Sequence, residues 1–413
     1  MRILALQSGT SADGIDVAVM DVEGAEGAST DDVDLRFVPL RSRTASWPEG
    51  LRDRVLDVVH GGALTAAEWC RLDTELGQAF ADAAASAAPP GGVDLVVSHG
   101  QTVHHWVDGG RARGTLQLGS PAWIAERLDA PVVADLRTAD IAAGGEGAPL
   151  MAVFDRAWLG GAARAVGRPI ATANLGGIAN VQVVHPDGSV EAHDSGPGNG
   201  LLDAVVGRAT GGGSAYDRDG AIAAAGSVHA GLLGELLAHP YFSAPPPKST
   251  GRETFTLAVF DAAVERADAA SAPLGDQLAT LAELTAVTVV GAVPDGADEL
   301  VLSGGGVHNA ELVRRIRAHA EPRGIRVASS AERGVDPDAK ETLLFGLLGW
   351  MRVHGVAADL ARDARGEPRV LGTITAARRP DGCGGRHRSE AARHRIAAIT
   401  VQPDCTSTME DDA

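Results

Sequence analysis

The chain has 413 residues, which is long for one compact core and favours about two domains. Its formal net charge of −18 excludes a protein that binds nucleic acid through a basic surface, so any phosphate ligand must be held by backbone amides, helix ends or a metal ion. Three cysteines without CxxC spacing indicate neither a disulfide framework nor a zinc site, and without a signal-peptide core or a bilayer-long apolar run we expect a cytoplasmic protein.

Hydrophobic periodicity predicts strands that alternate with helices, which is typical of α/β architecture. Strands at 3–7 and 15–22 form a hairpin around a polar turn, and a second hairpin occupies 170–184. The other expected strands are 93–103, 130–136, 298–305 and 324–330. The expected helices are 48–60, 64–88, 121–128, 150–160, 200–208, 228–238, 256–268, 274–291 and 339–355. Residues 137–150 read as a loop, and the polar stretch 378–413 reads as a disordered tail with a short helix near 388–398.

The turn of the first hairpin, SGTSADGID at 8–16, suits a phosphate ligand. Its glycines allow a tight fold in which successive N–H groups converge on an anion, and its hydroxyl groups add further donors. Asp13 and Asp16 can orient a metal-bound water. An ordinary hairpin turn has the same composition, so this turn alone leaves both interpretations open.

Two further glycine-rich segments follow. NLGGIAN at 174–180 again joins two apolar runs, and VLSGGGVHN at 301–309 runs from a strand through three glycines into a helix, where α/β domains place nucleotides. Neither a dinucleotide fingerprint nor a P-loop motif is present. Two glycine-rich hairpins in two domains could hold a polyphosphate from both sides, although each is also an ordinary turn.

Polar side chains with chemical potential lie in three other segments. In HDSGPGN at 193–199, Asp194 precedes a stiff Gly-Pro-Gly turn and can serve as a general base, or as an Asx-type turn residue. SHGQTVHH at 98–105 lacks metal-site spacing and favours polar substrate contacts or a plain loop. In RTADIAAGGEGAP at 137–149, Arg137 can bind a carboxylate with two hydrogen bonds or form a surface salt bridge.

In order and spacing these segments, with YDRDG, HPYFSAPPPKSTGRE and VDPDAKETLLFG, resemble the anhydro-N-acetylmuramic acid kinase family of bacterial cell-wall recycling. The resemblance runs from about residue 3 to 376. It implies a two-domain, actin-like ATPase (ribonuclease H-like) α/β fold with ATP in the interdomain cleft. Domain I is then expected at 1–136 plus 346–377, and domain II at 137–345.

The family uses ATP, Mg²⁺ and water to convert 1,6-anhydro-N-acetylmuramic acid to N-acetylmuramic acid 6-phosphate, and Asp194 matches its general base. The resemblance implies nucleotide contacts at Gly9, Thr10, Ser11, Ala12, Asp13, Gly14, Ile15, Asp16, Asn174, Gly176, Gly177, Asn180, Gly304, Gly305, Gly306 and Asn309. It implies substrate contacts at His99, Gln101, Thr102, Arg137, Asp140, Glu146, Gly196, Pro197, Gly198 and Asn199, with Arg137 facing the lactyl carboxylate. Glu341 and Asp13 are placed near the metal.

The sequence departs from the family pattern at a few positions. Gln7 stands where a methionine is usual, and Lys340 and Thr342 flank Glu341 where apolar or small residues are usual. Two alternatives remain: a kinase of the same fold for another sugar or carboxylate, without ring opening, and an ATP-driven switch, for which a peptide-binding module after the core is missing. We expect a small-molecule substrate, no nucleic acid or membrane partner, and a homodimer as the candidate assembly.

Overall fold

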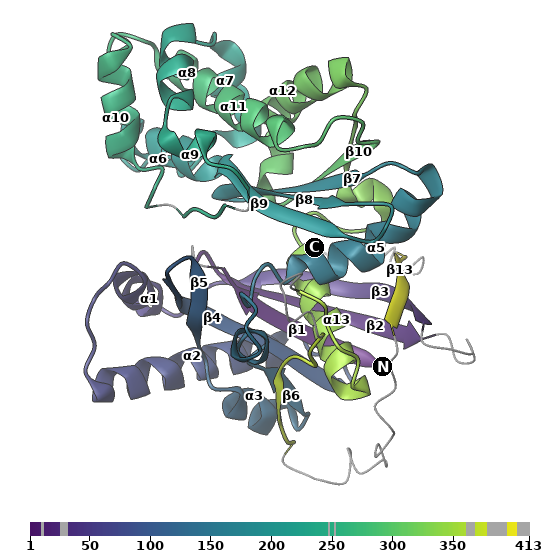
Figure 1. The fold of residues 1–413 in the computed structure, drawn as a ribbon. Coiled ribbons are helices and arrows are strands. Elements are labelled where there is room, and N and C mark those ends of the chain that lie inside the picture. The colour runs from purple at the N-terminus through teal and green to yellow at the C-terminus, as the bar shows by residue number, and fades with distance from the viewer. Residues whose placement is uncertain are drawn as a thin grey trace, which may run out of the picture. The chain divides into compact units, whose positions relative to one another are not determined.

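The computed structural model describes residues 1–9, 12–24, 32–246, 248–251, 253–360, 368–377 and 395–402. The chain divides into two compact units, unit 1 with Met1–Trp158 and Ala339–Ala413, and unit 2 with Leu159–Asp338 (Figure 1). The expected division into 1–136 plus 346–377 and 137–345 stays a prediction, and the compact units divide after Trp158 and before Ala339. The helix α13 (Lys340–His354) packs on the sheet of unit 1.

Unit 1 is built on a mixed sheet. Its strands are β1 (Arg2–Ser8), β2 (Ile15–Gly24), β3 (Asp32–Ala45), β4 (Leu95–Asp108), β5 (Arg111–Leu118), β6 (Val132–Ala134), β12 (Thr373–Thr375) and β13 (Arg395–Val401). The order is β12-β6-β4-β1-β2-β3-β13, with β5 paired to β4. The first three strands form an antiparallel meander, and β4 and β6 run parallel to β1.

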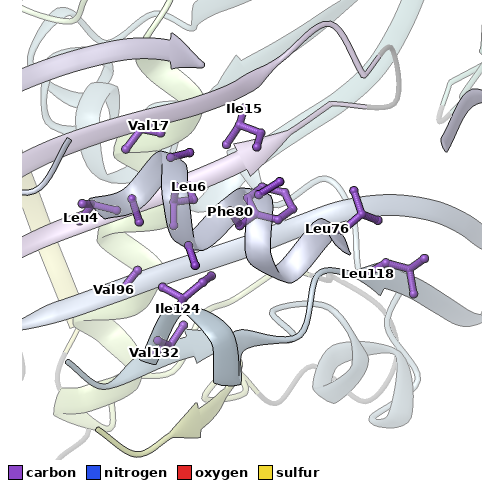
Figure 2. Packing of buried hydrophobic residues seen from close by; sticks show 14 of the residues in the cluster. Leu4, Leu6, Ile15, Val17, Leu76, Phe80, Val96, Leu118, Ile124 and Val132 are labelled. Carbon is purple, nitrogen blue, oxygen red and sulfur yellow. The ribbon is translucent and has the colours of Figure 1, made fainter. Parts of the chain in front are cut away.

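Both faces of this sheet are covered by helices. Alternation in β1 points Leu4 and Leu6 to one face, where they form one core cluster with Leu76 and Phe80 of α2 (Ala66–Ala87) (Figure 2). A capping box, Thr65 with Glu68, starts α2. The helix α13 covers the other face so closely that a Cβ at Gly349 would overlap Val97. Small residues therefore permit the close packing that a chain poor in aromatics requires. The remaining helices of unit 1 are α1 (Leu51–Val59), α3 (Pro121–Leu128) and α4 (Thr138–Ala142), and α5 (Met151–Val166) spans the boundary between the units.

Five elements of unit 1 differ from the sequence-based prediction, and two of them are the strands β5 and β12. The strand β3 was missed, and α4 lies in the segment that was read as a loop. The expectation of a disordered tail with a helix near 388–398 is wrong for Arg395–Val401, which forms β13 parallel to β3. The strand forms because Ile399 and Val401 become buried and the long edge of β3 offers backbone hydrogen bonds. Residues 378–394 and 403–413 lie outside the described residues.

Unit 2 repeats the strand scheme of unit 1. Its strands are β7 (Ile170–Leu175), β8 (Ile178–Val184), β9 (Val190–Pro197), β10 (Glu299–Ser303) and β11 (Arg326–Ser329), in the order β11-β10-β7-β8-β9. The first three are again antiparallel, and β10 and β11 are parallel to β7. Its helices are α6 (Asn199–Ala209), α7 (Ala221–Ala225), α8 (Ala230–Leu237), α9 (Pro240–Ser243), α10 (Leu257–Arg266), α11 (Leu274–Gly291) and α12 (Ala310–Ala320). The expected ribonuclease H-like α/β class is confirmed in both units.

Among the described residues no single helix is both long and apolar enough to cross a membrane, and only the sharply bent pair Arg218–Ala225 and Ala230–Leu237 reaches that length and composition together.

Candidate active site

Hydrogen bonds from Arg52 and Gln101 fix the backbone of the turn between β1 and β2. Ala12 is buried with φ +49°, in the left-handed region, and its N–H donates to the Gly9 carbonyl at 3.0 Å. The Arg52 guanidinium donates to the Ala12 carbonyl at 3.0 Å and pairs with Asp13 at 3.3 Å. The Gln101 side chain donates to the Gly9 carbonyl at 3.1 Å, so β4 supports the same turn. The predicted contacts Thr10 and Ser11 lie outside the described residues.

Two carboxylates meet below this turn. The Gln7 amide donates to Asp16 Oδ2 at 2.8 Å and also hydrogen-bonds Glu341, while Thr44 Oγ1 donates to Asp16 Oδ1 at 2.7 Å. Burial raises the pKa of Glu341, and Asp16 raises it further. The structure thus brings Asp16 close to Glu341, whereas the exposed Asp13, predicted as a metal ligand, pairs with Arg52.

The Asp16 and Glu341 carboxylates could supply part of a Mg²⁺ coordination shell. Mg²⁺ is usually bound by one or two protein carboxylates, and water and substrate phosphates supply its other ligands. Among the described residues no group of three His, Cys, Asp or Glu side chains lies close enough to hold a metal alone. Asp16 and Glu341 are therefore candidates for a site completed by phosphate and water.

A histidine of β4, His99, lies beside an arginine at the start of α4, Arg137. Arg137 Nε and Nη2 lie 3.3 and 3.2 Å from His99 Nε2, and the His99 ring stacks on Phe345 with centroids 4.6 Å apart. Burial and the Arg137 charge hold the pKa of His99 well below its usual range, so its imidazole is neutral. Since Nε2 accepts from Arg137, Nδ1 carries the proton and can donate. Burial lowers the pKa of Arg137 to about 10, which leaves it cationic at neutral pH.

Buried polar atoms without partners cluster in the same part of unit 1. Ser8 Oγ, Ser98 Oγ, His99 Nδ1 and Gln101 Oε1 are buried and have no hydrogen-bond partner among the described residues. Leaving such an atom unpaired costs about 1–3 kcal/mol. The four atoms lie where the parallel pairing of β1 with β4 ends, and they indicate that a polar ligand or water completes this region. Ser98 was not predicted as a site residue.

The other predicted substrate residues of unit 1 make contacts within the protein. Asp140 is buried and accepts from the Gly147 N–H at 2.7 Å, and Glu146 accepts from the Ala112 N–H at 2.7 Å. Arg137 also donates to the Gly147 carbonyl at 2.8 Å. These bonds shape the 144–149 loop, so Asp140 and Glu146 have a structural use, and their contact with substrate stays a prediction. Thr102 lies 3.4 Å from His99 Nε2.

In unit 2 three glycine-rich segments converge. The N–H groups of Gly198 and Asn199 donate to the carbonyls of Gly177 and Gly176 at 3.0 and 2.8 Å. A Cβ at Gly304 would overlap the Asn174 side chain. A Cβ at Gly306 would overlap the Leu175 side chain, so the 304–306 segment lies directly against the end of β7. The predicted nucleotide segments of this unit therefore lie together, and Asn309 caps α12 through the Leu312 N–H at 3.0 Å.

A polar row crosses the sheet of unit 2. Asn180 lies opposite Asn174 on one side and opposite Asp194 on the other. Directly opposed residues of antiparallel strands point to the same face, so all three side chains share one face of the sheet. The row links the glycine-rich hairpin to the predicted base.

Asp194 is held with one carboxylate oxygen committed. Its Oδ2 accepts from the Thr250 N–H at 2.8 Å, its N–H donates to the Lys248 carbonyl at 3.0 Å, and its carbonyl accepts from the Tyr241 hydroxyl at 2.6 Å. Oδ1 has no hydrogen-bond partner among the described residues. Burial raises the pKa of Asp194 above its ordinary value, and the Thr250 bond opposes this. The half-buried carboxylate is thus directed and can accept a proton at Oδ1.

Two α/β units of ribonuclease H-like topology, each with a glycine-rich hairpin, and a directed carboxylate in one of them, define an actin-like ATPase fold equipped for phosphoryl transfer. A family model described as anhydro-N-acetylmuramic acid kinase matches residues 1–377, so the chain belongs to that family, as the resemblance indicated.

Curated relatives of that name agree with the family model. The chain is 47% identical to an anhydro-N-acetylmuramic acid kinase from Streptomyces coelicolor, over 92% of this chain and 95% of the relative. It is 42% identical to the one from Rhodococcus erythropolis (91% and 94%) and 39% identical to the one from Gloeobacter violaceus (86% and 93%).

Several contributors to the site were missed or undervalued from the sequence. Gln7 was noted only as a departure from the family pattern, although it bridges the two carboxylates. Lys248 and Thr250 lie in PPPKSTGRE at 245–253, for which the sequence suggests either a surface that closes on the substrate or a rigid surface loop, and the sequence suggests no role for Tyr241. These three residues lie 47 to 56 residues from Asp194 in the chain, and no local pattern reports a contact at that separation.

Proposed function

We propose that this chain phosphorylates and hydrolyses 1,6-anhydro-N-acetylmuramic acid in one ATP-dependent reaction that yields N-acetylmuramic acid 6-phosphate, as part of cell-wall recycling in the cytoplasm. The observation that carries the proposal is the geometry of Asp194. Its Oδ2 is fixed by the Thr250 N–H at 2.8 Å and its Oδ1 is left to accept a proton, in a chain of the kinase family.

The reaction balances with one protein base. Asp194 takes a proton from water as the water oxygen bonds to the anomeric carbon, and the bond from that carbon to O6 breaks. O6 takes the γ-phosphoryl group, and ADP leaves. A glycosidase needs a second carboxylic acid to protonate the leaving oxygen, whereas here the phosphoryl group captures it.

ATP and Mg²⁺ are the proposed cofactors. Backbone amides of 9–16, 174–177 and 304–306 bind phosphate oxygens, which suits a chain whose charge offers no basic field. Asp16 and Glu341 would hold Mg²⁺ or its waters, and Asp13 is a further candidate. When bound, Mg²⁺ supplies neutralisation of phosphate charge.

The substrate contacts proposed for unit 1 use His99 and Arg137. The Arg137 guanidinium binds the lactyl carboxylate, and the His99 Nδ1–H donates to a sugar oxygen. In unit 2, Gly196, Pro197, Gly198 and Asn199 follow Asp194 and shape the backbone beside it. No nucleic-acid or membrane partner is required, and a homodimer is the proposed assembly.

The proposal is tested by incubating the purified chain with ATP, Mg²⁺ and the 1,6-anhydro sugar in ¹⁸O-labelled water and identifying the product by mass spectrometry. We expect a 6-phosphate with one ¹⁸O at C1. Asp194→Asn should abolish both bond cleavage and phosphorylation while nucleotide binding persists. Glu191→Gln, on the same strand but exposed, is the matched control and should turn over normally. A phosphorylated product without ¹⁸O would favour a kinase that does not open the ring, and full turnover by Asp194→Asn would exclude Asp194 as the base.

A further inference from the structure

A lysine that touches Asp194 through its backbone also anchors the segment around it. We infer that Lys248 is a positioning residue for Asp194: its ammonium group ties α9 to the 248–250 segment, and these two elements together aim the Asp194 carboxylate. The inference rests on the proposed role of Asp194 as the base.

The ammonium group of Lys248 binds the end of α9. Its Nζ donates to the Tyr241 carbonyl at 3.0 Å and to the Phe242 carbonyl at 3.4 Å, and it stands 4.6 Å from the centre of the Tyr241 ring. Carbonyls at a helix end are short of intrahelical partners, so a cation with several donors satisfies them well. The ring face adds a cation–π attraction.

Helix α9 and the 248–250 segment hydrogen-bond to three atoms of Asp194. Tyr241 of α9 donates its hydroxyl to the Asp194 carbonyl, the Lys248 carbonyl accepts from the Asp194 N–H, and the Thr250 N–H donates to Oδ2. The bonds therefore close a ring, from Asp194 to Tyr241, from Tyr241 to the Lys248 ammonium, and from the Lys248 backbone to Asp194. Without the ammonium group this ring is open, and the Thr250 N–H that directs the carboxylate is held less firmly.

Packing keeps α9 beside β9 and does not replace this link. Phe242 lies so close to Gly196 that a Cβ there would overlap its ring, and Phe242 stacks on Phe255 with centroids 5.6 Å apart. These apolar contacts hold the helix against the strand but make no bond to the 248–250 segment. The titratable groups near Asp194 are His193 beside it, Tyr241 and Lys248. Burial and the Lys248 charge lower the pKa of His193, and burial lowers the pKa of Lys248.

The test compares steady-state kinetics of Lys248→Met, Lys248→Arg and Tyr241→Phe with those of the native chain. Misplacement of a catalytic group by about 1 Å can cost about 100-fold in rate, so we expect kcat of Lys248→Met to fall by about 10- to 100-fold. The KM for ATP should stay within about twofold, because the glycine-rich segments are unchanged. Lys248→Arg, which can donate to the same carbonyls and cover the ring, should recover most of the loss. Tyr241→Phe removes only the hydroxyl group and should lower kcat in the same sense.

Arg208→Met is the matched control, because Arg208 also lies over a ring, Phe260 at 5.8 Å, and pairs with Asp261 in the same unit. It should leave kcat unchanged while shifting the unfolding temperature about as much as Lys248→Met does. A kcat of Lys248→Met within about twofold of native, or a loss shared equally by Arg208→Met, overturns the inference. If Lys248→Met does not fold, a native kcat for Tyr241→Phe overturns it. These outcomes are distinct from failure of the proposed function, which would leave the native chain inactive on the sugar or Asp194→Asn active.

Discussion

The buried ion pair between Lys340 and Asp155 allows a quantitative prediction of stability. Lys340 lies in the first turn of α13, and its Nζ is 2.8 Å from Asp155 Oδ1 and 3.1 Å from Oδ2. The two side chains are 4% and 0% exposed, so neither charge is hydrated. Trp158 lies beside the ammonium group, with its ring centre 5.6 Å from Nζ.

Lys340→Met keeps most of the side-chain volume and leaves the Asp155 carboxylate buried without its cation. Removing one partner of a buried pair costs about 3–5 kcal/mol, and replacing both partners by apolar residues is often neutral. We therefore expect Lys340→Met to lower the free energy of unfolding of unit 1 by about 3–5 kcal/mol, and Lys340→Met with Asp155→Leu to recover much of that loss.

The assay is urea denaturation of the full-length chain, followed both by Trp fluorescence and by far-UV circular dichroism so that separate unfolding of the two units is detected. The exposed pair Arg208–Asp261, with side chains 41% and 55% exposed, provides a control whose loss should cost about 1 kcal/mol or less. A cost below about 1 kcal/mol for Lys340→Met, or a double variant less stable than the single one, would refute the reasoning.

Four further predictions concern the site and the sheet edge. Gly304 has φ +80°, and a Cβ there would overlap the Asn174 side chain. We therefore expect Gly304→Ala to lower the nucleotide affinity measured by calorimetry at least about tenfold. Gly305→Ala, where nothing lies near the added Cβ, is the control and should fold normally. Because burial raises the pKa of Asp194 in the folded state, its negative charge opposes folding above the unfolded-state pKa of about 4. Asp194→Asn should therefore be at least as thermostable as the native chain at pH 7, and the difference should vanish below a pH of about 4. A lower stability of Asp194→Asn at pH 7 would contradict this. For the same reason kcat/KM of the native chain should fall on the acid side through a pKa above that of an ordinary aspartate. Truncation after residue 377 removes the buried Ile399 and Val401, whose burial is worth about 1.5–3 kcal/mol each, and leaves β3 without its neighbouring strand. We therefore expect a lower unfolding temperature, and concentration-dependent association measured by light scattering. An unchanged melting curve would show that β13 does not stabilise the sheet.

The sequence predicted the fold class and many of the site segments because those signals are local. Periodicity and turn residues within a few positions predict both glycine-rich hairpins, the strand that ends in SGGG and most helices. The strand β3 was not predicted because its charged and apolar residues alternate imperfectly. The strand β13 was not predicted because it is stable only when β3 lies beside it, which is a property of the sheet and not of residues 395–401.

The sequence by itself determined the family and the repeated glycine-rich hairpins, because the identity and order of the motifs can be recognised without coordinates. It also predicts Asp194 as the base. Only the tertiary structure decided which groups act on one another. It placed Asp16 near Glu341 through Gln7, paired Lys340 with Asp155, and set Lys248 and Tyr241 around Asp194. The physical reason is that hydrogen bonds, desolvation and charge pairing depend on distances between atoms tens to hundreds of residues apart in the chain, and folding alone sets those distances.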